Sequence, residues 1–158
     1  MNQVQVQGES TPPTGRVYYA GTASYDAGSA FSYVEDATLE ASLSGNAKKN
    51  ARGVLAEQPT TASLHLFAGC AVTSGTGPGW VDVYKPVRGY TARVKVDGTT
   101  DVAVGDPLAI QNGSWHLANF TPPTDSGDLL EMVAVAMEAE TDAPGSQSAG
   151  QTRLVYFK

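Results

Sequence analysis

The fold class is decided by one stretch, residues 100–110, which reads Thr-Asp-Val-Ala-Val-Gly-Asp-Pro-Leu-Ala-Ile. Val102 and Val104 alternate with small or polar neighbours, as in a strand with one buried face. Gly105-Asp106-Pro107 has the composition of a turn, and Leu108 and Ile110 then resume the alternation. The stretch therefore predicts a strand, a corner and a second strand.

The residues that follow predict a hairpin. Asn112-Gly113 is the pair favoured by two-residue hairpin turns, in which both central residues need a positive φ. Trp115 and Leu117 are expected on one face of the returning strand. One corner and one hairpin thus lie within about twenty residues, and neither resembles an active site.

Short apolar or alternating segments continue along the rest of the chain, separated by Gly, Pro, Asn and Asp. Segment 35–50 is ambiguous: Leu39 and Leu43 suit a short helix, with a loop or a strand as the alternative. Segments 21–29 and 74–79 are predicted loops. The expected fold is all-β, a small β-barrel or a β-sandwich with at most one short helix. The predicted strands are 16–20, 30–34, 52–57, 63–72, 80–84, 90–96, 129–138 and 153–157.

The N-terminal region is expected to stand apart from the body. Val4 and Val6 alternate with glutamines, and Pro12-Pro13 follow in a hinge-like segment. Residues 1–15 are therefore interpreted as an extended arm, and residues 16–158 as a single β-rich domain. The arm is either a frayed terminus or a strand that adds to a neighbouring subunit.

Composition and charge limit the possible partners. The net charge is −6 and the sequence pI is about 4.7, so there is no cationic excess to displace counterions from a nucleic acid. Cys70 is the single cysteine, which excludes an intrachain disulfide and suits a reducing cytoplasm. No apolar run approaches the length of a membrane span, and the first residues do not resemble an export signal. Neither nucleic acid nor membrane is an expected partner.

Catalytic and metal-binding patterns are not found. His65 and His116 are the two histidines, and each alternates with apolar residues on a predicted strand. Together with Cys70 they lack the spacing of a zinc site, which needs about four ligands. Glycines at 75–79 have no following lysine or helix to bind a phosphate, and the aspartates near glycine do not match a calcium loop. The sequence predicts no enzyme, no cofactor and no metal.

The C-terminal half resembles a known family. Val-x-Val-Gly-Asp-Pro-Leu at 102–108, the Asn-Gly pair, the strand Met132 to Ala139 and the closing segment Arg153 to Phe157 are similar to the head decoration, or capsid cement, proteins of tailed bacteriophages. The upstream segment 52–57 also looks like an early core strand of that family, so the resemblance covers residues 52–158. The long, tyrosine-containing N-terminal region departs from the family pattern.

The resemblance implies a structural protein of the virion. It would be made in the host bacterial cytoplasm and would bind the outside of an icosahedral capsid, cementing neighbouring major capsid proteins. It implies self-association as a homotrimer, with a dimer as the alternative. The expected contacts with capsid or subunit are Val4, Val6, Arg16, Tyr18 and Tyr19. The alternative function is a receptor- or carbohydrate-binding β-module of a phage fibre or spike, in which Trp80 or Trp115 stacks on sugar rings.

Overall fold

The computed structural model describes residues 11–34, 54–96, 101–120, 132–141 and 152–158. Within these ranges the chain forms twelve β-strands and one 3-10 helix, η1 (Thr61–Ser63), so the predicted all-β fold is confirmed. The ambiguous segment 35–50 and the first ten residues, with Val4 and Val6, lie outside the described residues.

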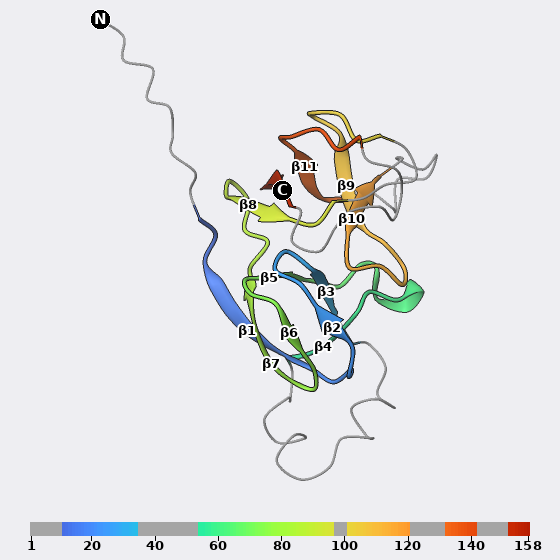
Figure 1. The fold of residues 1–158 in the computed structure, drawn as a ribbon. Helices are drawn as coiled ribbons and strands as arrows, with labels where there is room; N and C mark the ends of the chain where they lie inside the picture. Colours follow the sequence, from blue (N-terminus) through green and yellow to red (C-terminus); the bar gives the residue numbers. More distant parts are fainter. Residues whose placement is uncertain (1–10, 35–53, 97–100, 121–131, 142–151) are drawn as a thin grey trace, which may run out of the picture.

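Five strands close into a small barrel (Figure 1). Their order around the barrel is β1-β4-β3-β5-β7, and every neighbouring pair is antiparallel except β1 with β4. β1 begins two residues before the predicted start of the body, and the Lys85 amide donates to the Pro13 carbonyl just ahead of it. The barrel strands are β1 (Thr14–Tyr19), β3 (Ala30–Tyr33), β4 (Leu55–Glu57), β5 (Phe67–Ala71) and β7 (Gly79–Tyr84).

A second sheet lies beside the barrel (Figure 1). Its order is β10-β9-β11-β12-β8 and all its neighbours are antiparallel. The strands are β8 (Thr91–Val94), β9 (Pro107–Ile110), β10 (Leu117–Asn119), β11 (Met132–Ala136) and β12 (Arg153–Phe157). The two predicted loops, 21–29 and 74–79, instead pair with each other through β2 (Ser24–Tyr25) and β6 (Gly75–Thr76).

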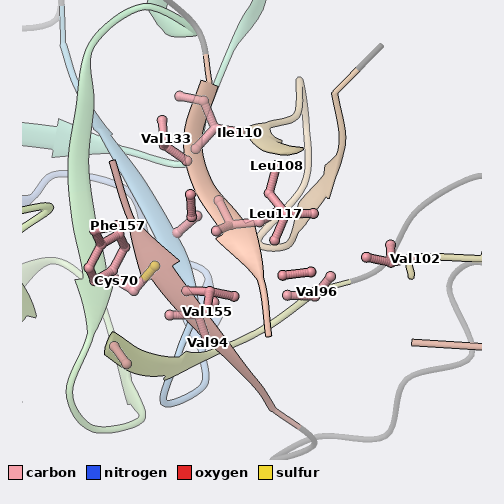
Figure 2. Close-up of a cluster of buried hydrophobic side chains, with 14 residues drawn as sticks. Cys70, Val94, Val96, Val102, Leu108, Ile110, Leu117, Val133, Val155 and Phe157 are labelled. Carbon is pink, nitrogen blue, oxygen red and sulfur yellow. The ribbon is translucent and has the colours of Figure 1, made fainter. Parts of the chain in front are cut away.

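The molecule has two apolar cores that share one wall. In β5, Ala68 and Ala71 face the barrel interior, whereas Phe67 and Cys70 face the second sheet. Figure 2 shows Cys70 among the valines and Phe157 of this second core. Because both faces of β5 are buried, its sequence Phe-Ala-Gly-Cys-Ala is a continuous apolar run.

Gly69 makes the shared wall possible. Simple alternation would put Phe67 and Ala71 on the same face, but the pairing with β3 shifts register here and the two residues face different cores. Gly69 has φ +135°, and a Cβ at this position would lie 2.3 Å from the Tyr84 carbonyl oxygen. Only glycine fits this conformation and this space.

Residues 100–110, the stretch that decides the fold class, differ from the prediction in their first half. β9 forms as expected, but residues 102–104 are not a strand: Val102 makes an isolated bridge with Glu140, and Val104 is 67% exposed. The Asp106 amide donates to the Ala103 carbonyl, and the Asp106 carboxylate accepts from the Ala103 amide. This side-chain bond favours a turn over a strand ladder, which is the physical reason for the error.

The predicted two-residue hairpin is also wrong. β9 and β10 are joined by residues 111–116, and Gly113 has φ +69° while no non-glycine residue in the described ranges has a positive φ. The Ser114 amide donates to the Gln111 carbonyl, so the turn needs a positive φ at one position only. Trp115 precedes the strand and packs against the barrel core, whereas Leu117 belongs to the second core.

The predicted strand 63–72 begins later than expected. η1 and a turn occupy residues 61–65, and the strand starts at Phe67. Ser63 is buried, and its hydroxyl bonds the Ser32 hydroxyl and accepts from the Thr60 amide. His65 is therefore an exposed turn residue and not a strand residue.

Candidate functional site: an exposed face of the barrel

The outer face of β1 and β7 carries large polar and aromatic side chains. The antiparallel register places Arg16 opposite Asp82 and Tyr18 opposite Trp80. The intervening residues Val17 and Val81 point into the barrel and are buried. Four outward side chains thus form one continuous surface, which we call the β1–β7 face: Arg16, Tyr18, Trp80 and Asp82.

Two cross-strand contacts organise this face. The Arg16 Nε lies 2.8 Å from the Asp82 carboxylate, and both side chains are more than half exposed. The rings of Tyr18 and Trp80 meet edge to face, with centroids 5.5 Å apart and planes at 86°. Cross-strand aromatic and ionic pairs each contribute up to about 1 kcal/mol to a sheet. The pairs therefore hold the four side chains in place without burying them.

Trp80 is the most distinctive residue of the face. It is 43% exposed, although an indole has a large apolar surface that normally becomes buried. Tryptophan, tyrosine and arginine are also the residues most enriched at the energetic centres of protein interfaces. The β1–β7 face is consequently suited to binding a macromolecular surface, with the indole as its anchor.

The predicted contact residues have different positions. Arg16 and Tyr18 lie on the β1–β7 face, as a contact role requires. Tyr19 is 4% exposed and packs inside the barrel, where burial raises the pKa of its phenol, so it is not available on the outer face. Val4 and Val6 lie outside the described residues. The alternation Val17, Tyr19 against Arg16, Tyr18 already separates the two faces in the sequence.

Trp80 and Asp82 were absent from the expected contact set, although their alternation with Val81 and Val83 was a clear signal. What the sequence does not show is that β7 pairs with β1, because the two strands are separated by 66 residues at the Arg16–Asp82 pair. Trp115, the other tryptophan, lies among the barrel aromatics, 5.0 Å from Phe31 and 5.7 Å from Tyr19 between ring centroids. Trp80 is therefore the exposed member of the pair.

The titratable side chains considered in the sequence are scattered. Cys70 is fully buried in the second core, and burial raises the pKa of its thiol. His65 is exposed after η1, and His116 lies just before β10, where its amide donates to the Ser114 hydroxyl. In the part of the chain that the structure describes, no group of three or more His, Cys, Asp or Glu is arranged to hold a metal ion. In the same part, no helix is long and apolar enough to cross a membrane.

The fold and this face define an all-β domain in which a closed five-stranded barrel is backed by a second five-stranded sheet. No protein-family model matches the sequence, and no curated protein matches it. Among solved structures, the chain is similar to the N base of the head fiber protein gp8.5 of bacteriophage phi29. The TM-score is 0.52 at 12% sequence identity, over 92% of this chain and 93% of that one. At this identity the likeness is one of fold.

Proposed function

We propose that this protein is a structural component of a bacteriophage head, which binds the outside of the capsid through its β1–β7 face and ties neighbouring major capsid proteins together. The observation that carries the proposal is the fold likeness to a phage head fiber base over nearly the full length of both chains. The sequence resemblance to capsid cement proteins points independently to the same location.

The β1–β7 face supplies a chemistry suited to this role. Trp80 and Tyr18 offer an aromatic centre, and Arg16 and Asp82 lie beside it as a polar rim. An interface of this kind concentrates its energy in a few aromatic or arginine side chains, and the surrounding residues exclude water. Many copies on a symmetric shell would add avidity to a modest single contact.

Capsid binding is tested by incubating the purified protein with undecorated, expanded capsids and measuring co-sedimentation. Trp80→Ala should weaken binding by about 30-fold or more, the effect of losing a hot-spot residue worth about 2 kcal/mol. Val104→Ser is the matched control, since Val104 is also an exposed apolar residue but lies outside the barrel. Unchanged co-sedimentation of Trp80→Ala, or equal loss in both variants, would contradict a role for this face.

A second candidate function rests on the same indole. An exposed tryptophan beside a tyrosine can stack on a sugar ring, as in a receptor-binding module of a fibre. The discriminating measurement is binding of the protein to host surface glycans in the absence of capsids. Glycan binding that Trp80→Ala abolishes, together with no co-sedimentation with capsids, would favour this alternative.

A further inference from the structure

Within the described residues, the edge of the second sheet carries a stretch of backbone that has no strand partner. β8 is the last strand of this sheet and pairs with β12 alone. Leu154 of β12, opposite Arg93, directs its amide and carbonyl toward the β11 side, where they bond Glu138 and Met137. Arg93, and Thr91 two residues before it, therefore direct their amide and carbonyl groups away from β12.

These groups form a short open edge. Lys95 directs its backbone groups to the same side as Thr91 and Arg93, and both groups are hydrogen-bonded. Its amide donates to the Gly28 carbonyl, and its carbonyl accepts from the Leu117 amide. For Thr91 and Arg93 there is no backbone partner among the described residues. The Thr91 hydroxyl oxygen is itself buried and lacks a hydrogen-bond partner within the same ranges. Unsatisfied groups of this kind are a template for a further strand.

A cavity of about 210 Å³ lies along this edge. Small-molecule sites usually have about 300–1,000 Å³, so this volume suits side chains of an added peptide better than a separate ligand. Apolar surface from Tyr84, Ala92 and Leu154 lines it next to the polar Thr91 and Arg93. Its remaining walls are Thr11 and Pro12, the first described residues of the chain.

We infer that the open edge of β8 accepts residues 2–7 of a second copy of this chain as an added strand. This segment reads Asn-Gln-Val-Gln-Val-Gln, so its two faces differ: Val4 and Val6 suit the apolar cavity wall, and the glutamines suit Thr91. A glutamine amide beside Thr91 would satisfy the buried hydroxyl oxygen. The segment has no charged side chain, so it adds no repulsion between chains that each have a net charge of −6.

The reach of the segment favours a second copy over the same chain. Val4 precedes Thr11 by seven residues, which is roughly 23 Å of extended chain, whereas a four-residue strand such as β8 spans roughly 13 Å. A fully extended segment of this length would be longer than β8, so Val4 would reach beyond β8 of its own chain. Exchange of such arms between copies assembles an oligomer at a low cost in free energy. The inference goes beyond attachment to a head and holds whether or not the protein binds capsids.

The oligomeric state of the full chain provides the first test, by sedimentation velocity. The unmodified protein should be an oligomer, and deletion of residues 2–10 should convert it into a folded monomer. Val4→Asp with Val6→Asp should do the same, whereas the matched control Gln3→Asp with Gln5→Asp places equal charge on the other face and should weaken association at least tenfold less. A monomeric full chain, or an oligomer that survives the deletion, would overturn the inference.

Cysteine cross-linking identifies the acceptor edge. Gln3→Cys, Gln5→Cys and Gln7→Cys, each mixed with a separate Thr91→Cys protein, should give a disulfide-linked pair of chains for at least one glutamine position. The natural Cys70 is buried and does not compete. A chain with both substitutions that forms its disulfide within itself, or no cross-link at any of the three positions, would overturn the assignment to a second copy. Capsid binding is not needed for either result, so failure here is distinguishable from failure of the proposed function.

Discussion

The barrel and the second sheet differ in whether their edge strands are paired. The barrel closes through the pairing of β1 with β7, and its core is rich in aromatic rings, with Phe31 within 5.4 Å of the rings of Tyr19, Tyr25 and Trp115. The second sheet ends at β8 in the part of the chain that the structure describes, and its core consists mainly of valine, leucine and alanine around Phe157. Closure removes the edges of a sheet, whereas an open sheet retains them.

The two regions are suited to different kinds of recognition. The closed barrel presents the polar and aromatic side chains of its β1–β7 face. An open sheet can be recognised through its main chain, as at Thr91 and Arg93. Side-chain recognition suits a different protein, and strand addition suits an extended segment whose alternate side chains fit the acceptor edge. We therefore expect substitutions in the two regions to have separable effects on stability and on assembly.

The largest expected effect compares two fully buried phenylalanines, one in each core. Phe31→Ala should lower the free energy of unfolding by about 5 kcal/mol and Phe157→Ala by about 3 kcal/mol, within the usual range for such truncations. The difference arises because Phe31 also loses several aromatic contacts, each worth roughly 0.5–1.5 kcal/mol. Equilibrium unfolding in urea measures both. Equal losses in the free energy of unfolding would show that the aromatic contacts of Phe31 add no stability beyond the burial of its ring.

The next effect concerns the wall that the two cores share. Gly69→Ala should cost about 3 kcal/mol, because the new Cβ meets the Tyr84 carbonyl and the backbone leaves a region that L residues rarely adopt. Gly113→Ala is the control: φ is also positive at +69°, but a Cβ would have nothing within 4 Å, so we expect about 1 kcal/mol. Thermal unfolding monitored by circular dichroism compares the two, and similar losses would mean that the contact with Tyr84 is unimportant.

Alkaline pH should act on the barrel. Burial raises the pKa values of Tyr19 and Tyr25 above their ordinary value of 10.0, so the folded state favours the neutral phenols. Their contribution to stability is complete below pH 10 and declines as pH rises above it. Urea unfolding at a series of pH values should show this decline, and Tyr19→Phe should reduce its slope. An unchanged slope would exclude Tyr19 as its source.

Acid pH should act on the second sheet. The Leu154 amide and the Arg93 guanidinium donate to Glu138 and hold the pKa of its carboxyl below the ordinary value of 4.5. The resulting stability is present above that ordinary pKa and is lost as pH falls through the lower folded-state pKa. The effect is the smallest here because the ion pair is partly exposed. Glu138→Gln should flatten the acid limb of the same titration, and a steeper limb would contradict the assignment.

The sequence predicted the all-β fold well because the alternation of apolar and polar residues along a strand can be read from neighbouring residues alone. In β7 and β8 the residues Val81, Val83, Ala92 and Val94 are buried as their spacing predicts. The sequence did not predict which strands pair, since the β1–β7 pairing joins distant segments. It also predicted a strand at Val102–Val104 that does not form, because the Asp106 carboxylate accepts a hydrogen bond from the Ala103 amide and stabilises a turn. Half of the candidate face, Arg16 and Tyr18, was therefore predicted, and the half on β7 was found only through the pairing.

The closure of the barrel also determines how the chain must fold. β1 and β7 are separated by 66 residues at the Arg16–Asp82 pair. At a synthesis rate of 5–20 residues per second, roughly 3–13 s pass between the emergence of these two positions from a ribosome. During that interval β1 has an open edge, and the aromatic residues of the barrel core have no enclosed space. Non-local strand pairing is itself slow, on a scale of milliseconds to seconds. The nascent chain is consequently vulnerable to aggregation until β7 has emerged and paired with β1.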